Sequence, residues 1–146
     1  MSGGVLVTGG TGFLGSHLVR ALVRDGARVS VLVRNEAKLD GLGDIRVSYC
    51  GGDVTNLESL ESACKSIDPE TIFHLAADTS GRKFEGDWAQ AERSLQINFI
   101  GTMNLIRAAA TCGSNVRCVV RTGGLEEYGA GPGPPDEAQR ECPNSP

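Results

Sequence analysis

A cluster of glycines near the amino terminus has the spacing of a loop that binds phosphate groups. Gly10, Gly12 and Gly15 fit G-x-G-x-x-G, and Gly9, Gly12 and Gly15 fit G-x-x-G-x-x-G. Such glycines permit a tight turn, a close approach of the backbone to a diphosphate, and close packing of a helix on a strand. The first N–H groups of that helix would face the diphosphate. A tight turn without a ligand is the alternative interpretation.

A second candidate lies about twenty residues beyond the glycines, where an acidic side chain would bind the ribose 2′-hydroxyl of NAD. Val33 stands there instead, and Arg34 follows it. A guanidinium is suited to a 2′-phosphate and to stacking on adenine, so this pair favours NADP over NAD. The alternative is a solvated residue at a strand end, with its charge offset by Glu36.

The segments around these residues alternate between strand and helix patterns. Short apolar runs indicate strands at residues 5–8, 29–33, 45–49, 71–75 and 116–121, and helical spacing indicates helices at 13–25, 56–65 and 88–111. The alternation predicts an α/β fold with a doubly wound parallel sheet of the Rossmann type. In the longest helix, the apolar side chains expected to pack on the sheet are Leu95, Phe99, Met103, Ile106 and Ala110.

The composition changes after Tyr128, where a run of glycine and proline excludes both a helix and a central strand. The sequence therefore predicts a dinucleotide-binding domain over residues 1–129 and a loop with a polar tail over residues 130–146. A sheet left incomplete on its C-terminal side is expected of the front part of a longer protein. A natural short chain with a frayed tail is the alternative.

Composition excludes several classes of protein. The 146 residues carry 14 basic and 18 acidic side chains, a net charge of −4, so nucleic acid is not an expected partner. The apolar runs are too short to cross a bilayer and no signal peptide is recognisable, so we expect a cytoplasmic protein without a membrane partner. Five cysteines without a C-x-x-C pair suggest neither a disulfide framework nor a metal site. Four are expected to be buried: Cys50, Cys64, Cys112 and Cys118.

The second glycine pattern and several further motifs resemble the extended branch of the short-chain dehydrogenase/reductase superfamily, the NAD(P)-dependent epimerase/dehydratase family. The further motifs are Gly52-Asp53-Val54, His74-Leu75-Ala76-Ala77, Asn98 followed by Gly101-Thr102, and a degenerate segment over residues 122–129. The resemblance covers nearly the whole chain. It implies an oxidoreductase, epimerase or dehydratase that exchanges a hydride between bound NAD(P) and a hydroxyl or keto group of a nucleotide sugar or similar substrate.

The resemblance also implies which positions contact the cofactor. In the glycine segment these are Gly9, Gly12, Phe13, Leu14 and Gly15. Asp53 would accept a hydrogen bond from the adenine amino group and Val54 would pack on the ring, although an ordinary helix N-cap is the alternative for Asp53. The small residues that would let the cofactor ribose approach the strand are Leu75, Ala76 and Ala77. We interpret His74 as a strand residue and not as a catalyst.

The resemblance implies a reactive hydroxyl and a Tyr-x-x-x-Lys helix in the active site. The usual hydroxyl position falls at Gly124, so Thr122 could serve only if the loop shifts. Asn98 would order structure and solvent near the site, or else be an exposed helix amide. Tyr128 is not the catalytic tyrosine, because Pro132 stands where the lysine would be. Without the Tyr–Lys pair, this chain alone is expected to bind cofactor weakly and to catalyse nothing.

Three other functions remain open. An NADP-dependent ketone or aldehyde reductase, acting on sterol-like or flavonoid-like substrates, would fit the Val33-Arg34 pair. A non-catalytic NAD(P)-binding sensor would fit the missing Tyr–Lys pair, and a scaffold that binds nothing is the third. The expected partners are the dinucleotide, a small-molecule substrate of the full-length protein, and a second copy of the chain in a homodimer.

Overall fold

The computed structural model describes residues 3–34, 42–43, 45–80, 87–111, 115–129, 133–134, 136 and 138–142. It contains a sheet of five parallel strands in the order β3-β2-β1-β4-β5. The strands are β1 (Gly4–Thr8), β2 (Arg28–Val33), β3 (Ser48–Gly51), β4 (Pro69–His74) and β5 (Cys118–Arg121). The chain builds outward from β1 to β3 and then crosses to β4, so the strand order reverses between β1 and β4. The predicted doubly wound parallel sheet is confirmed.

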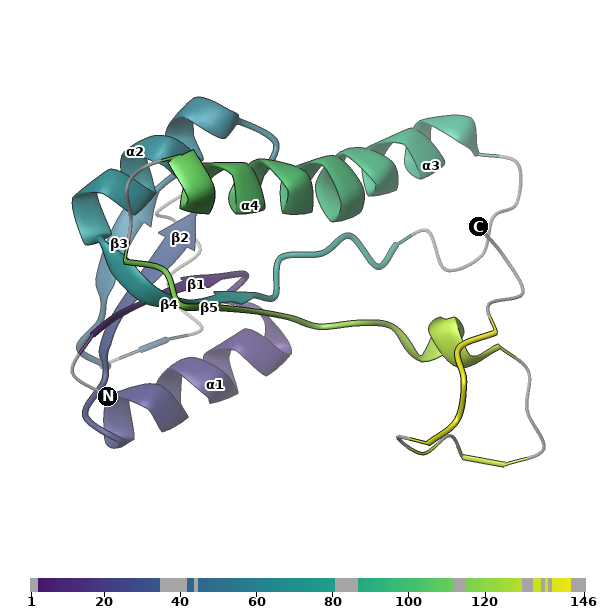
Figure 1. Ribbon diagram of the computed structural model, residues 1–146, viewed down its shortest axis with the longest axis horizontal. Helices are drawn as coiled ribbons and strands as arrows, with labels where there is room; N and C mark the ends of the chain where they lie inside the picture. The colour runs from purple at the N-terminus through teal and green to yellow at the C-terminus, as the bar shows by residue number, and fades with distance from the viewer. Residues whose placement is uncertain are drawn as a thin grey trace.

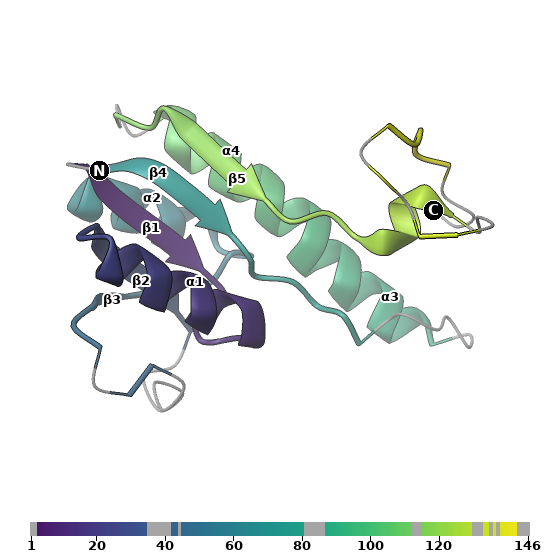
Figure 2. The same ribbon diagram turned by 90° about the horizontal axis from the view of Figure 1, so that it is seen from below.

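Helices cover both faces of the sheet (Figure 1). Helix α1 (Phe13–Arg24) lies on one face, and α2 (Leu57–Ile67) lies on the other beside one long helix. That long helix consists of α3 (Trp88–Leu95), a π-helical turn η2 (Gln96–Ile100) and α4 (Gly101–Thr111), and a short 3₁₀ helix η3 (Leu125–Tyr128) follows β5. In Figure 2, α3 extends beyond the carboxyl ends of β4 and β5. The end of the sheet at which ligands bind in doubly wound folds is therefore flanked by α3 and η2.

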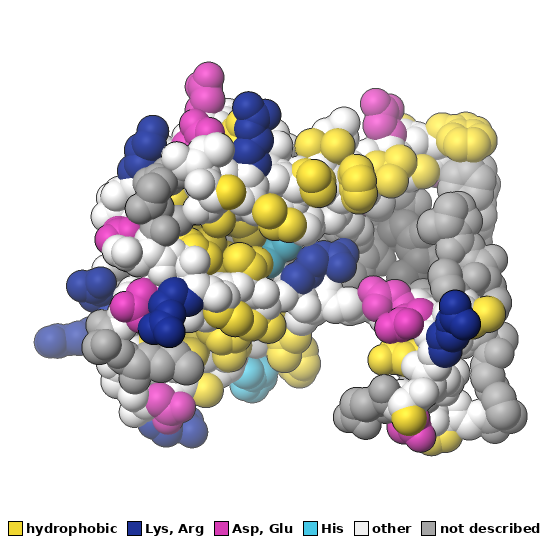
Figure 3. Space-filling view, in the orientation of Figure 1, with side chains coloured by type: hydrophobic (Ala, Val, Ile, Leu, Met, Phe, Trp, Pro, Cys, Tyr) yellow, Lys and Arg dark blue, Asp and Glu magenta, His cyan; other side chains and the backbone are white. Residues whose placement is uncertain are grey.

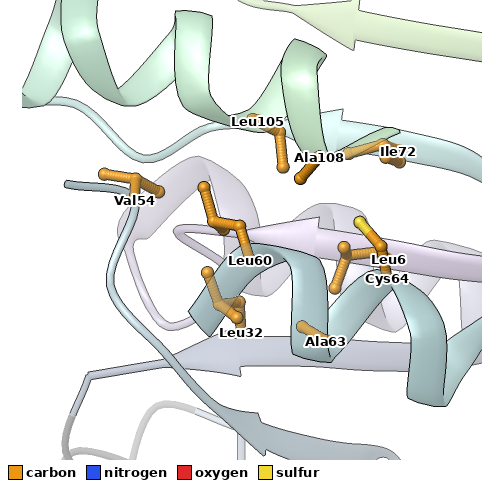
Figure 4. Close-up of a cluster of buried hydrophobic side chains, with 9 residues drawn as sticks. All are labelled: Leu6, Leu32, Val54, Leu60, Ala63, Cys64, Ile72, Leu105 and Ala108. Carbon is orange, nitrogen blue, oxygen red and sulfur yellow. The ribbon is translucent and has the colours of Figure 1, made fainter. Parts of the chain in front are cut away.

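Buried apolar side chains fill the space on both faces of the sheet. Leu6, Leu32 and Ile72 point from the strands toward Leu60 of α2 and Leu105 of α4 (Figure 4). A second cluster, between the sheet and α1, contains the alternate strand residues Val5, Val7, Val29 and Val31, together with Val19 of α1. Because successive strand residues point to opposite faces, a strand buried on both sides is mostly apolar. This explains the composition of β1 and β2, in which Thr8 and Ser30 are buried polar residues.

The third strand begins later than the predicted segment, residues 45–49. It starts at Ser48, where its pairing with Ser30 of β2 begins. Ile45 and Val47 still pack, half-buried, on the cluster beneath α1. The apolar spacing of these two residues therefore reflects their burial against the core, although they are not part of the strand.

The prediction that the apolar stripe of the long helix packs on the sheet is wrong. The exposed fraction is 63% for Leu95, 61% for Phe99, 52% for Met103 and 49% for Ile106, and Ala110 is exposed as well. The helix instead buries Gly101, Leu105 and Ala108. A Cβ atom on Gly101 would lie 2.9 Å from Cγ2 of Val54, so at this position the helix approaches too closely for a side chain.

The cysteines and the tail agree only in part with expectation. Cys64 is buried, and burial raises the pKa of the half-buried Cys50 thiol to about 11. Cys118 is exposed on the edge strand β5, so its predicted burial is wrong, and Cys112 lies outside the described residues. The division at residue 129 remains a prediction, although the Cys142 N–H donates to the Glu127 carbonyl at 2.9 Å. None of the helices described is long and apolar enough to cross a membrane.

Candidate functional site

A pocket of about 610 Å³ opens at the carboxyl ends of β1, β2 and β4, where the strand order reverses. It is lined by Thr8, the last residue of β1, by Gly9, which follows it, and by the segment from Leu75 to Asp78 that follows β4. Arg93 and Ile97 line it from the long helix. The pocket therefore lies where parallel α/β sheets bind their ligands.

Two of the glycines are required by the fold itself. Gly9 has φ +70°, and a Cβ there would lie 2.6 Å from both the Ala76 nitrogen and the Leu75 carbonyl carbon. A Cβ on Gly15 would overlap the Gly9 carbonyl oxygen and lie 2.7 Å from the Cα of Gly10. These two positions bring β1 against β4 and α1 against the turn, whether or not a ligand binds.

Gly12 is not explained in the same way. It is the exposed N-cap residue of α1, and the one close neighbour of an added Cβ would be the Gly9 carbonyl oxygen at 3.2 Å. No side chain caps α1, and its first turn contains no acidic residue. Gly12 lines the pocket, and the N–H groups of the first helical turn that follows it suit an anion. An added Cβ at Gly12 would require the Gly9 carbonyl to shift slightly, a much weaker constraint than at Gly9 or Gly15, and this favours the ligand-binding interpretation over a simple turn.

The remaining predicted cofactor contacts fall into two groups. Five line the pocket: Arg34, Val54, Leu75, Ala76 and Ala77. Phe13 and Leu14 do not line it; their side chains are exposed on the first turn of α1, and the Phe13 ring contacts the His17 ring edge-on at 5.2 Å. The contact roles of both groups remain predictions.

Asp53 is not the N-cap of α2, so that alternative is wrong. Asn56 caps the helix, because its side-chain oxygen accepts from the Ser59 N–H at 3.0 Å. Oδ1 of Asp53 accepts from both the N–H and the hydroxyl of Thr55, each at 2.8 Å. Asp53 thus stabilises the turn that carries Val54 to the pocket, and the pocket lining does not include Asp53 itself.

A chain of hydrogen bonds passes through the buried His74. Nδ1 of His74 lies 2.6 Å from the Thr8 hydroxyl, and Nε2 lies 3.0 Å from the Thr102 hydroxyl. Because the Thr102 hydroxyl donates to the Asn98 carbonyl at 2.7 Å, it must accept from Nε2–H. Nδ1 then accepts from the Thr8 hydroxyl, whose oxygen accepts from the Ala76 N–H at 3.3 Å. This direction satisfies every group and assigns the neutral Nε2–H tautomer.

The surroundings of His74 keep it neutral. Burial, with a smaller contribution from the positive charge of Arg121, lowers the pKa of His74 from 6.5 to about 4. A second ring proton would point at a hydroxyl that already donates to that nitrogen. His74 is therefore a structural link between β1, β4 and α4, in keeping with its interpretation as a strand residue.

Asn98 lies in the π-helical turn and fixes the wall of the pocket. Its side-chain oxygen accepts from the Asp78 N–H at 2.7 Å, and its side-chain nitrogen donates to the Asp78 carbonyl at 2.9 Å. Both ends of the amide are thus used by the backbone of one residue, and Asn98 itself does not line the pocket. The alternative of an exposed helix amide is wrong, and a role near the reacting groups remains a prediction.

Thr122 lies outside this arrangement. It is exposed in the segment after β5 and is not among the residues that line the pocket. The Gly124 N–H donates to a carboxylate oxygen of Glu127 at 3.0 Å, which holds the same segment in its turn. The role of Thr122 as the reactive hydroxyl therefore stays a prediction, which the pocket geometry does not support.

Two charged residues of the pocket were missed by the sequence analysis. Asp78 follows the strand-end alanines, and Arg93 lies on α3; the Arg93 Nε atom lies 3.4 Å from Oδ2 of Asp78. Hydrogen bonds from the Ser80 hydroxyl and N–H are the main reason why the pKa of Asp78 is below its usual range. The signal available in the sequence was an acidic residue directly after Leu75-Ala76-Ala77, but its partner lies fifteen positions away.

Comparisons with known proteins agree with this geometry. A family model described as the NAD dependent epimerase/dehydratase family matches residues 5–146. Sterol demethylase protein B of Methylococcus capsulatus is 34% identical over 127 residues, which cover 87% of this chain and 36% of that protein. The dTDP-glucose 4,6-dehydratase of Neisseria meningitidis is 30% identical over 112 residues, 72% of this chain and 31% of that protein.

Solved structures show the same fold. The UDP-glucose 4-epimerase of Thermus thermophilus, solved in complex with NAD, superposes with a TM-score of 0.80 and 30% identity. The match covers 97% of this chain and 45% of the epimerase. The chain therefore spans about a third of the two curated relatives described above and less than half of this structural neighbour.

The neutral state of His74 makes stability depend on pH. His74 binds its proton with a pKa near 6.5 when unfolded and about 4 when folded, so its contribution is complete above pH 6.5 and is lost as the pH falls toward 4. We expect a loss of about 3 kcal/mol over that interval. Urea unfolding at pH 7.0 to 4.5 should show a shallower dependence for His74→Gln than for the wild type. The exposed His17→Gln control should keep the wild-type slope; equal slopes for all three proteins would contradict the prediction.

Proposed function

The chain belongs to the NAD dependent epimerase/dehydratase family, and we propose that its pocket binds NAD(P) as the cofactor of an oxidoreductase, epimerase or dehydratase. The observation that carries the proposal is Gly12. It stands at the uncapped start of α1 on the edge of the pocket, where a side chain would be tolerated by the turn but would obstruct a diphosphate. The activity of the whole protein is part of this proposal, because the chain spans a minority of its relatives' length.

Different pocket residues would bind different parts of the cofactor. The N–H groups of the α1 first turn would hold the diphosphate, and Val54, with Asp53 behind it, would face the adenine. The small residues Ala76 and Ala77 would let a ribose approach the backbone. When bound, the nicotinamide would supply or accept a hydride at a hydroxyl or keto carbon of the substrate. The residues of this chain bind and orient the cofactor for that exchange.

The substrate proposed is a nucleotide sugar or a similar hydroxyl or keto compound. The names of the Thermus epimerase and the Neisseria dehydratase, a UDP-glucose and a dTDP-glucose enzyme, support this class. A ketone or aldehyde reductase is the second candidate, supported by the sterol-related name of the Methylococcus relative and by Arg34 in the pocket. Asn98 and Thr122 remain proposed active-site residues for either reaction.

Dinucleotide binding can be tested directly on this chain. A thermal-shift titration with NAD(H) and NADP(H) should stabilise the wild type by about 2.7 kcal/mol at a concentration near 100 Kd. Gly12→Val should remove the shift, because its side chain would occupy the diphosphate position while the N-cap backbone, at φ −75°, accepts valine. Gly133→Val, exposed and without close neighbours, is the matched control and should bind normally. Binding by Gly12→Val at wild-type strength would contradict the assignment.

We further propose that the pocket prefers NADP to NAD. Arg34 lines the pocket directly after the apolar Val33, so a guanidinium and no carboxylate follows the end of β2. An arginine can form a bidentate pair with a 2′-phosphate, which NAD lacks. Glu36, the residue that could offset this charge, lies outside the described residues.

The preference predicts a selective effect of Arg34→Ala. Isothermal titration should show that the variant loses about tenfold or more in NADP⁺ affinity, the usual effect of removing a charge-assisted hydrogen bond, and little in NAD⁺ affinity. Arg46→Ala, exposed and outside the pocket lining, should bind both cofactors as the wild type does. A wild type that binds NAD⁺ more tightly, or an unchanged affinity ratio in Arg34→Ala, would refute the preference.

The homodimer is also retained as a proposal, with the exposed helix stripe as its support. The stripe comprises Trp88, Leu95, Phe99, Met103 and Ile106, all between 49% and 76% exposed. Hydrophobic side chains gather over α3 and α4 in Figure 3. Glu92, exposed between Trp88 and Leu95, is the charged residue on this face, and the apolar run from Leu95 to Ile106 can pack on its own copy about a two-fold axis.

Disruption of the stripe should separate the subunits. Light scattering coupled to size exclusion should give a dimer mass for the wild type and a monomer mass for the Phe99→Lys, Met103→Lys double variant, because two buried ammonium groups would be unpaired. Leu14→Lys places the same charge on α1, on the opposite side of the sheet, and should leave the dimer intact. A monomeric wild type would exclude the proposal.

A further inference from the structure

Arg93 is a charged residue of the pocket whose guanidinium is only partly used by contacts within the fold. It lies on α3, one helical turn before Ile97, and both residues line the pocket on the side across from the glycine turn. Its side chain is 66% exposed, and its Nε atom lies 3.4 Å from Oδ2 of Asp78. An exposed ion pair of this kind contributes little to stability, so folding alone does not account for it.

The carboxylate that holds Arg93 is itself held firmly. Only 7% of the Asp78 side chain is exposed. Oδ1 accepts from the Ser80 N–H at 3.0 Å and from its hydroxyl at 2.5 Å, and the Asn98 amide fixes the Asp78 backbone on both sides. Gln90 ties the same segment to α3 through the Ser80 carbonyl at 2.8 Å. A rigid carboxylate therefore faces Arg93 from the wall of the pocket.

The second oxygen of this carboxylate, Oδ2, faces the guanidinium of Arg93. Oδ2 of Asp78 is buried and accepts no hydrogen bond from the described residues. After the larger effect of the Ser80 hydrogen bonds, the charge of Arg93 and the side chain of Ser94 both help to lower the pKa of Asp78. The contact fixes the guanidinium through its Nε edge, and none of the hydrogen bonds or ion pairs found among the described residues uses its two Nη groups. A positioned, planar fork of N–H donors suits a phosphate or another oxyanion.

The charge of the pocket favours an anion as well. The chain carries a net charge of −4, yet the charged residues that line the pocket are Arg34, Arg93 and Asp78, an excess of one positive charge. Arg34 and Arg93 come from β2 and α3, on separate walls of the pocket. Two cations so placed would attract a ligand with more than one anionic group.

We propose that Arg93 is an oxyanion-binding residue of this pocket, oriented by Asp78, and that it binds a phosphate group. The proposal rests on the proposed function, which supplies two sources of that phosphate: the dinucleotide itself or a nucleotide-linked substrate. Arg93 contacts the ligand, whereas Asp78 and Asn98 are positioning residues that act through it.

Calorimetric titrations of the full chain test this assignment. NAD⁺ is titrated first, and UDP is then titrated into the NADH-saturated chain, each with the wild type, Arg93→Ala, Arg93→Lys and Asp78→Asn. Arg93→Ala should weaken one of the two ligands about tenfold and reduce the salt dependence of its binding. Arg93→Lys should recover part of the loss, because it keeps the charge without the fork. Asp78→Asn should show an intermediate loss.

Arg107→Ala is the matched control, because Arg107 is exposed on α4 and does not line the pocket. Its affinities should equal those of the wild type. In Arg93→Ala, a lower affinity for NAD⁺ identifies a cofactor phosphate as the ligand. A lower affinity for UDP alone identifies a substrate phosphate. Unchanged affinities for both ligands in Arg93→Ala, with a normal unfolding midpoint, would overturn the role of Arg93 but not the proposed function. A wild type that binds neither ligand would overturn the proposed function and this inference together.

Discussion

The close approach of β1 to β4 at their carboxyl ends is the constraint on which the rest of the structure depends. Gly9 lies so near the backbone of Leu75 and Ala76 that no side chain fits between them. The Leu75 N–H donates to the Thr8 carbonyl at 3.0 Å, and the Ala76 N–H donates to the Thr8 hydroxyl at 3.3 Å, which continues the pairing past the last strand residue. Helix α1 then packs on the turn through Gly15. The pocket opens here because the two strand ends are fixed while their connections leave in opposite directions.

A relay of polar contacts extends this constraint to the long helix. His74 joins Thr8 to Thr102, and Asn98, one turn earlier, fixes the backbone of Asp78. The sheet end and the π-helical turn are thus bound at two points on the same segment, 74–78. Such an insertion in a helix often marks a functional site. Here the π-helical turn carries Asn98, whose side chain holds the backbone of Asp78. A shift of the helix would therefore move the pocket wall, and a shift of the wall would move the helix.

The sequence predicted the sheet better than it predicted the surfaces. Alternating apolar runs and helical spacing were sufficient for a parallel α/β fold, because a strand buried on both faces has no other composition. The long helix has two apolar faces, however, and periodicity alone cannot choose between them. The face that packs on the core is the one with Gly101, Leu105 and Ala108, where the helix lies against Val54, and Phe99 and Met103 are exposed. The Asp78–Arg93 contact was not predictable for a related reason: it joins a strand end to a helix, and neither residue belongs to a recognised motif.

The polar groups around the pocket divide into those used by the fold and those left for a ligand. The Thr8 hydroxyl is turned toward His74, the Asn98 amide is occupied by Asp78, and Oδ1 of Asp53 is occupied by Thr55. The charged groups that line the pocket in the described part of the chain are the guanidinium groups of Arg34 and Arg93 and the carboxylate of Asp78, an excess of one positive charge. Most of the amide and hydroxyl groups around the pocket are thus used to hold its shape, whereas the guanidinium groups of Arg34 and Arg93 suit an anionic group.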